Sequence, residues 1–236
     1  MSIVLQDLSL SVLHAGKRLS LIEGVNLVFP TKTMALIGES RLAVVATLDL
    51  LCRRLIPQRG AVHFNGAVSW PIGWAGPFSI TITGTQAISH FATLYGFDRN
   101  QGLAFMKCEF AAPELLTLPM STWPTALRTQ FTMLMALLPA FDVYLIDASL
   151  IVLDHAAFSK RFLELYNIRR QGKTTLITAR QTKVLHALCD GAIVVESQKI
   201  YLQNDLDTAL AISNKITLET APDEEKIEDI DDGFLL

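Results

Sequence analysis

The stretch that most constrains the fold runs from Met34 to Leu51. It begins as a short apolar strand, turns at Gly38 and continues as a helix whose apolar residues recur at helical spacing. Strand, glycine turn and helix form the frame of a phosphate-binding P-loop, in which backbone N–H groups cradle phosphates. The frame is therefore present, and the next question is whether its ligand-binding residues are.

The residues that bind phosphate and magnesium in a P-loop are missing from this frame. Counting from Gly38, the second glycine of the motif falls on Ala43, the lysine on Val44 and the hydroxyl on Val45. Valine supplies neither the charge that meets the β- and γ-phosphates nor a Mg²⁺ ligand. Glu39 adds negative charge where a phosphate would lie. Taken alone, the stretch fits an ordinary strand–turn–helix better than a P-loop that has lost its chemistry.

Composition and charge exclude several classes of function. Half of the 236 residues are hydrophobic, which is enough for a large core. The net charge of −3 comes from residues 223–236, which hold seven acids and one lysine, and the remainder has a small positive excess, too mild to indicate nucleic-acid binding. Cys52, Cys108 and Cys189 lie far apart, form no metal or redox motif, and favour a reducing compartment.

Neither a signal peptide nor a transmembrane helix is expected. Asp7 interrupts the first apolar run. Residues 60–97 contain no Asp, Glu, Lys or Arg, but glycine and proline recur too often for a spanning helix. The mean hydropathy of +0.35 therefore indicates a large core or an apolar docking surface.

Hydrophobic periodicity predicts an antiparallel β region, followed by a parallel α/β core that begins at the Gly38 turn and carries a helical insertion. Strands are expected over residues 3–12, 19–22, 25–29, 34–37, 61–68, 141–147, 174–178, 192–195 and 199–202. Helices are expected over residues 42–51, 85–95, 99–110, 125–138, 158–170, 181–188 and 205–212. Loops are expected over residues 70–84 and 113–124.

The tetrapeptide Gly172-Lys173-Thr174-Thr175 has the sequence that ends a P-loop. The motif would require a glycine at Asn167, and the tetrapeptide precedes a strand where a P-loop follows one. A turn ahead of a buried strand is the better interpretation.

Three stretches, in order and at matching spacing, carry a resemblance to a known family. The first is Arg59–Phe78 with Ile82-Thr83-Gly84, which includes Ser69-Trp70-Pro71-Ile72-Gly73. The second is Phe141–Asp147, followed by Asp154 and Phe158, and the third is Leu188-Cys189-Asp190 with Ala192–Val195. On these residues the chain resembles the ATP-binding subunits of ABC transporters, closest to those of capsular and surface polysaccharide export, over nearly its whole length.

The resemblance implies an α/β fold of the ABC-type nucleotide-binding domain. Such a domain has a P-loop NTPase-like parallel core, an antiparallel β subdomain and a helical subdomain. Here it corresponds to a single domain over residues 1–220 with a helical insertion at about 85–138. Residues 221–236 are expected to form a disordered, acidic tail, a solvated terminus or an interaction segment.

The chain departs from the family pattern at the positions to which the resemblance assigns catalysis. The adenine-stacking aromatic falls near Val12, and the Q-loop glutamine falls on Ser79. The signature glycine falls on Ala126, within Pro124-Thr125-Ala126, where a side chain obstructs the approach to a partner's γ-phosphate. The catalytic glutamate falls on Ala148 and the switch histidine on Arg180.

The positions that remain allow more than one interpretation. The strand-end Asp147 keeps the type of a Mg²⁺ ligand, but it could cap a helix. Arg180 could contact a phosphate or be a solvated or capping residue, and Glu39 could form a local ion pair with Arg41. The vestigial nucleotide site comprises Gly38, Glu39, Ser40, Arg41, Ala43, Val44, Val45 and Asp147.

The combined losses predict a pseudo-ATPase with no intact catalytic residue and no metal site. No cofactor is expected, with ATP and Mg²⁺ bound only if residual affinity survives. The resemblance implies an ABC permease subunit and a second ATP-binding subunit as partners, in a homo- or heterodimer, and no nucleic acid. It places the protein in the cytoplasm, peripheral to the inner membrane and in contact with it through the permease. Residues 70–82 are the expected permease-docking surface.

Two alternatives stay open. One is a working export ATPase whose catalytic groups have moved, for which Arg41 is the only cation near Gly38. The other is a soluble protein-interaction module that kept the fold and left transport.

Overall fold

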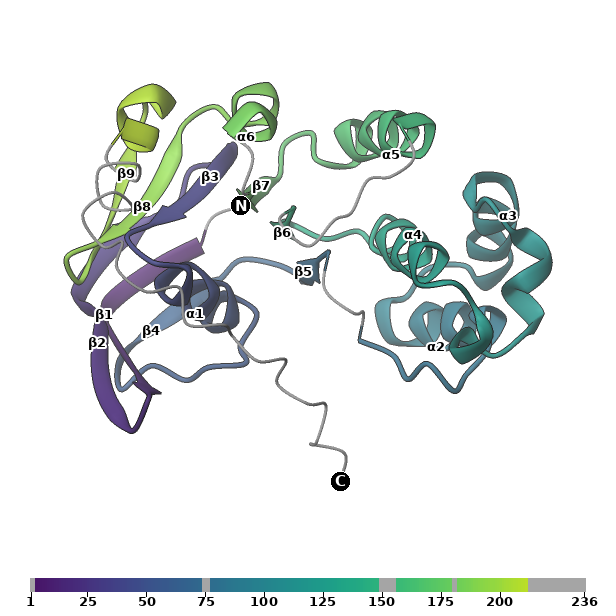
Figure 1. Ribbon diagram of the computed structural model, residues 1–236, viewed down its shortest axis with the longest axis horizontal. Helices are drawn as coiled ribbons and strands as arrows, with labels where there is room; N and C mark the ends of the chain where they lie inside the picture. Colours follow the sequence, from purple (N-terminus) through teal and green to yellow (C-terminus); the bar gives the residue numbers. More distant parts are fainter. Residues whose placement is uncertain (1–2, 74–76, 149–155, 180–181, 212–236) are drawn as a thin grey trace.

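The computed structural model describes residues 3–73, 77–148, 156–179 and 182–211. Two sheets form its frame (Figure 1). The first is antiparallel, in the order β2–β1–β4, and the second has the order β5–β6–β7–β3–β8–β9. The strands are β1 Ile3–His14, β2 Lys17–Val28, β3 Thr33–Gly38, β4 Arg59–Phe64, β5 Val68–Ile72, β6 Val143–Asp147, β7 Thr174–Thr178, β8 Ala192–Glu196 and β9 Lys199–Gln203.

The second sheet is parallel from β5 to β8, and β9 closes it as an antiparallel hairpin partner of β8. The helices of the described ranges are α1 Arg41–Leu51, α2 Gly84–Tyr95, α3 Arg99–Glu109, α4 Thr125–Met135, α5 Ala156–Arg169 and α6 Thr182–Leu188. Short 3₁₀ helices lie at Pro113–Thr117 and Met120–Thr122. Residues 206–211 are also helical. Within these ranges no helix combines the length and apolar character needed to cross a membrane. The predicted α/β fold is confirmed.

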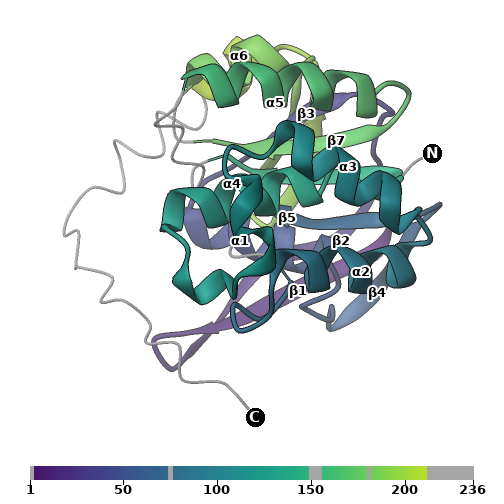
Figure 2. The ribbon, with the colours of Figure 1, turned by 90° about the vertical axis from the view of Figure 1, so that its right-hand side faces the viewer.

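The parallel sheet separates two hydrophobic cores because successive residues of a strand point to opposite faces. On β3, Met34 and Leu36 join a core shared with α1 and the antiparallel sheet, whereas Ala35 and Ile37 join a core shared with the helical layer. Figures 1 and 2 show the antiparallel sheet and α1 on one side and helices α2 to α5 on the other. Both faces of the central strands are therefore buried, as their continuous apolar sequences predict.

Several predicted elements were wrong in their extent, among them the helix expected at 125–138, which ends at Met135. The two strands expected at 19–22 and 25–29 form one strand, β2, with Gly24 at a positive φ of 59°. The strand expected at 61–68 is two strands in different sheets: β4 pairs with β1, and β5 pairs with β6. The chain turns between them at Gly66, whose φ is 127° and whose Cα faces the Asp142 carboxylate. The loop expected from residue 70 therefore begins after Ile72.

Helix ends follow local capping chemistry. Thr83 and Gln86 form a reciprocal capping box at the start of α2, and Gly96 ends that helix in the left-handed conformation. Asp98 then caps α3 by accepting the Gln101 N–H at 2.7 Å. These signals lie within a few residues in sequence, and the predicted bounds of both helices agree with the structure to within one residue.

An aromatic seam joins the helical layer to the parallel sheet. Trp70 of β5 meets Phe91 of α2 edge-on at a centroid distance of 5.4 Å, and meets Phe141, just before β6, at 5.6 Å. Phe78 links Phe91 to Phe131 of α4. Edge-to-face contacts of this kind add about 0.5–1.5 kcal/mol each beyond area burial. The seam therefore fixes the helical layer against one edge of the sheet.

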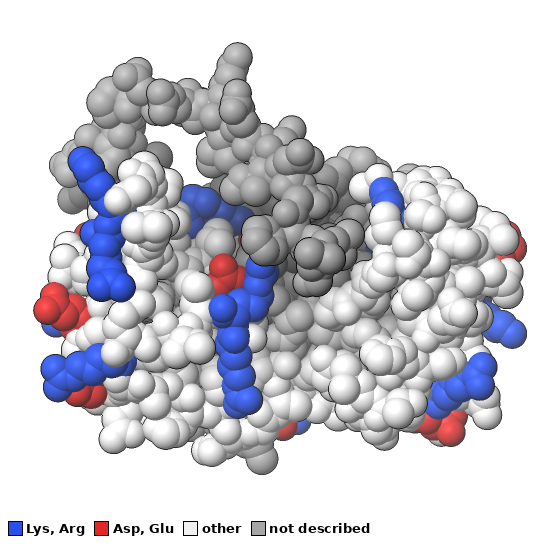
Figure 3. All heavy atoms as spheres, turned by 90° about the horizontal axis from the view of Figure 1, so that it is seen from below, with Lys and Arg blue, Asp and Glu red and all other residues white. Residues whose placement is uncertain are grey.

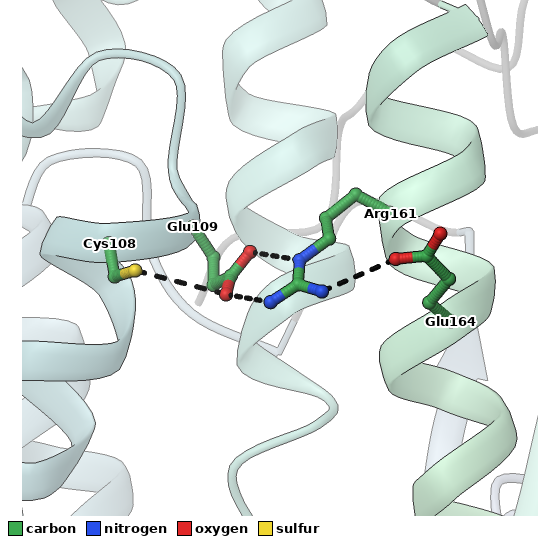
Figure 4. A network of polar contacts seen from close by, with 4 residues as sticks. All are labelled: Cys108, Glu109, Arg161 and Glu164. Carbon is green, nitrogen blue, oxygen red and sulfur yellow. Dashed lines mark hydrogen bonds and ion pairs between the residues drawn. The ribbon is translucent and has the colours of Figure 1, made fainter.

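A bidentate ion pair fastens α3 to α5 at the surface (Figure 4). The Arg161 Nε and Nη2 atoms donate to the two Glu109 carboxylate oxygens at 2.8 and 2.7 Å, and Nη1 reaches Glu164 at 3.3 Å. The hydrogen bonds from Arg161 hold the pKa of Glu109 below its ordinary value. The pair connects segments 52 residues apart and ties the insertion to the helix that follows β6.

We predict that Glu109→Gln lowers the melting temperature at pH 7 by about 2–4 °C, because the pair is screened by solvent on one side only: 53% of the Arg161 side chain is exposed, but 10% of the Glu109 side chain is. A carboxyl whose folded pKa is depressed stabilises above its unfolded pKa and loses that effect as pH falls through the folded value. The deficit should therefore vanish between pH 5 and pH 2, as followed by circular dichroism melts. Glu164→Gln is the matched control, and an equal pH dependence in both variants would contradict the assignment.

Candidate functional site

The turn between β3 and α1 is two residues long. β3 ends at Gly38 and α1 begins at Arg41, so only Glu39 and Ser40 connect them. Ser40 has an extended conformation, and its Oγ accepts the Ala43 N–H at 3.1 Å, which caps the helix. The predicted strand–turn–helix is confirmed. The helix begins earlier than the motif's second glycine position, so residues that a P-loop keeps in its phosphate cradle are helical here.

Valine side chains occupy the inner side of this turn. A Cβ placed on Gly38 would lie 3.0 Å from Val44 Cγ2 and 3.2 Å from the Val195 carbonyl oxygen. Val44 and Ala43 are buried and Val45 is half-buried. The side of Gly38 that faces α1 is therefore packed with hydrocarbon at the position where the motif places its lysine.

Glu39 is held by the hairpin between β8 and β9. Its backbone N–H donates to the Val195 carbonyl at 3.0 Å, and its carboxylate accepts the Ser197 N–H at 3.0 Å. Arg41 points elsewhere, so the Glu39–Arg41 ion pair considered from the sequence was wrong. The hairpin carries two residues with positive φ, Ser197 and Gln198, which bring this N–H to the turn.

Arg41 instead forms an ion pair with Asp147. The Nη2 atom lies 2.6 Å from Oδ2, and the Asp147 side chain has no solvent exposure, whereas 43% of the Arg41 side chain is exposed. Asp147 ends β6, next to Thr178 at the end of β7, and β7 lies between β6 and β3. Parallel strands end at one edge, so Arg41 spans two strand spacings, about 10 Å, to reach the carboxylate.

The pairing bears on the two interpretations of Asp147. The described part of α5 begins at Ala156, nine residues further along the chain, and residues 149–155 lie outside the described ranges, so the helix-cap interpretation stays a prediction. The carboxylate keeps the position of a metal ligand, but a guanidinium contacts it. Sequence reasoning missed this contact, although it identified Arg41 as the only cation near Gly38. The sequence did contain a signal for this contact, because it places one cation and one strand-end acid at the same predicted edge of the sheet.

The other predicted site residues that the structure describes contribute no side-chain ligand beside the Arg41–Asp147 ion pair. Ala148 is half-buried and donates its backbone N–H to the Thr178 carbonyl at 2.8 Å. Ser79 is exposed and its hydroxyl bonds that of Thr81. Ala126 lies in the first turn of α4, which has no side-chain cap. Val12 pairs with Leu19 in the antiparallel sheet.

Several predictions lie outside the described residues. Arg180, Asp154 and the tail at 221–236 belong to this group. The Gly172 tetrapeptide is described, and its interpretation as a turn is confirmed: Gly172 has a φ of 68° and β7 starts at Thr174. The Lys173 ammonium lies 2.8 Å from Asp142.

The described donors at this sheet edge differ from those of a magnesium-nucleotide site. The described residues at the sheet edge offer one buried carboxylate, already paired, and neither a lysine nor a hydroxyl at the Val44 and Val45 positions. In the described ranges no three metal-ligating side chains cluster together. On the face shown in Figure 3, basic side chains are scattered, and several lie beside acids. The absence of a nucleic-acid partner stays a prediction.

The fold defines the class of protein. A solved ATP-binding subunit of an ABC transporter superposes with a TM-score of 0.75 at 16% identity, covering 93% of this chain and 99% of that one. An ATP-binding cassette in a dimeric post-hydrolysis state, bound to ADP and Pi, gives 0.71 at 11% identity, covering 86% and 98%. The chain thus has the fold of an ABC-type nucleotide-binding domain.

Its sequence relatives narrow the class. The ATP-binding protein BexA of Haemophilus influenzae is 24% identical over 67% of this chain and 73% of its own length. The capsule polysaccharide export protein CtrD of Neisseria meningitidis is 24% identical over 68% and 74%. The polysialic acid transport protein KpsT of Escherichia coli is 25% identical over 75% and 81%. No family model matches the chain. The resemblance to polysaccharide-export ATP-binding proteins is confirmed.

We predict that Arg41→Ala costs about 3 kcal/mol of unfolding free energy at pH 8, because it leaves a buried carboxylate without its cation. Urea titrations of the variant and of the unchanged chain at pH 8 measure this cost.

The exposed pair Arg59–Asp7, at 2.8 Å, provides the control. Arg59→Ala should cost less than about 1 kcal/mol. Adding Asp147→Asn to Arg41→Ala should recover part of the loss, which a double-mutant cycle quantifies. Equal costs for Arg41→Ala and Arg59→Ala would contradict the role given to the buried pair.

Proposed function

We propose that this protein is a non-hydrolysing ABC-type subunit of a polysaccharide-export system, a structural or regulatory partner of a permease or of a catalytic ATP-binding subunit. The observation that carries the proposal is the Arg41–Asp147 ion pair. It places a tethered cation on the carboxylate that would otherwise face an exchangeable Mg²⁺. The names of the relatives support the assignment to polysaccharide export.

The other departures from the family pattern also argue against ATP hydrolysis. Val44 and Val45 remove the phosphate and metal ligands, and Ala148 carries no carboxylate that could polarise an attacking water. Phosphoryl transfer depends on positioning and charge stabilisation by such groups, each worth orders of magnitude in rate. A chain lacking all of them at once supports a role other than hydrolysis. The alternative of an ATPase with displaced groups has, in the sequence beside Gly38, no cation other than Arg41 to support it.

In the proposed assembly the protein lies at the cytoplasmic face of the inner membrane and pairs with a second ATP-binding subunit. Residues 70–82 are the proposed permease contact. In the described part of this stretch, Trp70 is anchored in the aromatic seam, whereas Ile80 has 50% of its surface exposed. An exposed apolar residue held beside an anchored segment suits a docking surface.

We predict that millimolar ATP, with or without Mg²⁺, leaves the melting temperature unchanged and that no phosphate is released. A working site at a hundred times its Kd would add about 2.7 kcal/mol, a shift of about 5 °C or more. Purified KpsT serves as the positive control for the assay. A Mg²⁺-dependent shift that Asp147→Asn removes would overturn the proposal.

We predict further that Ile80→Asp reduces co-purification with the permease of the same export system by about tenfold, since a charge would be buried at the contact. Ile56→Asp is the matched control, because Ile56 is 83% exposed and lies outside residues 70–82. Equal retention of both variants would exclude residues 70–82 as the docking surface.

A further inference from the structure

An apolar pocket of about 250 Å³ opens between α4, α5 and α6, over the ends of β6 and β7. Its walls include Met133 of α4, Phe162 and Tyr166 of α5, and Val184 and Ala187 of α6. A cavity of about 150 Å³ lined by such residues holds a benzene-sized group. This pocket therefore has room for an aromatic ring and an aliphatic neighbour.

The described part of the chain ends beside one wall of this pocket. Residues 206–211 form a helix, with Leu206 and Leu210 buried in the same core as Leu185 of α6. His186 of α6 lies 3.6 Å from Asp207 of that helix. The next 25 residues therefore start about one helix diameter from the pocket, and an extended chain of that length spans about 80 Å.

The chemistry of residues 227–236 matches the pocket. This stretch, Ile-Glu-Asp-Ile-Asp-Asp-Gly-Phe-Leu-Leu, alternates apolar residues with acids and ends in three apolar side chains. Among the described lining residues the pocket has one charged side chain, the exposed Lys183 of α6. A cation beside an apolar pocket complements acids that flank an apolar anchor.

We propose that the C-terminal stretch of this chain docks in the pocket, with Phe234 and Leu235 filling it and Asp231 or Asp232 facing Lys183. The occupant is a segment of the same chain, so the effective concentration is high and a small contact suffices for binding. Docking covers the half-buried Val184 and the exposed Ala187, which otherwise present apolar surface to water.

The test is photo-crosslinking in the full chain, with Phe234 replaced by the photoreactive p-benzoylphenylalanine. Irradiation should link position 234 to α4, α5 or α6 within one chain, as mapped by mass spectrometry. The same replacement at Thr217 is the control within the segment, and it should give little crosslinking to these helices. Equal patterns from both positions, or links to other elements, would overturn the proposal.

Three variants separate docking from general collapse. Ala187→Glu places a charge on the pocket wall and should abolish the crosslink, whereas Ala111→Glu, at another exposed alanine, should leave it intact. Lys183→Glu should weaken the crosslink most at low salt, since it reverses the charge at the pocket. In mixtures of ¹⁴N- and ¹⁵N-labelled protein, mixed-isotope crosslinks would identify a second copy as the occupant and refute the intramolecular arrangement.

If Ala187→Glu fails to fold, judged by circular dichroism, a second measurement decides. Unlabelled full chain carrying Phe234→Asp should show faster amide hydrogen exchange in α6 than the unchanged chain, because the pocket loses its cover. Unchanged exchange in α6 would overturn the proposal.

Discussion

A buried carboxylate at the carboxyl edge of a parallel sheet requires a positive partner, and much of this site follows from that requirement. Asp147 has no solvent exposure, and Arg41 approaches it to 2.6 Å. Arg41 can do so only because α1 begins at that residue, which in turn depends on the two-residue turn and on the Ser40 cap. The same early start brings Val44 against Gly38. The ion pair, the short turn and the packed valine are thus parts of one arrangement.

Two hydrophobic cores support that arrangement, and the side chains of β3 alternate between them. Odd and even residues of β3 face different cores, so the turn after Gly38 is fixed from both sides of the sheet. The aromatic seam from Trp70 through Phe91 attaches the helical layer at the opposite edge of the parallel sheet from β9. The Arg161–Glu109 pair, in which the arginine is exposed and the glutamate largely buried, adds a second attachment. Side chains of this chain therefore set the position of the helical layer against the sheet.

Local signals made most elements predictable, whereas contacts between distant segments were not. The Thr83 box, the Gly96 end and the apolar runs of β6 and β7 are encoded within a few residues, and their elements were predicted correctly. The division of residues 61–68 into β4 and β5 depends on Gly66 meeting the Asp142 carboxylate, 76 positions away, so the local pattern was read as one strand. The Arg41–Asp147 contact spans 106 positions for the same reason. The sequence predicted that the phosphate and metal ligands are missing, and the structure adds the contact between Arg41 and Asp147.

The replacement changes what can control such a domain. A Mg²⁺ nucleotide is exchangeable, so an ABC-type site that binds one can be switched by binding and release. A guanidinium on the same chain is tethered near the carboxylate, so its effective concentration there is high and does not depend on a free ligand. A ligand shifts an equilibrium only through a difference in affinity between two states. Under the proposed function, that difference must come from protein surfaces, such as the exposed Ile80 stretch and the apolar pocket beside Ala148. Regulation would therefore act through partners and chain segments.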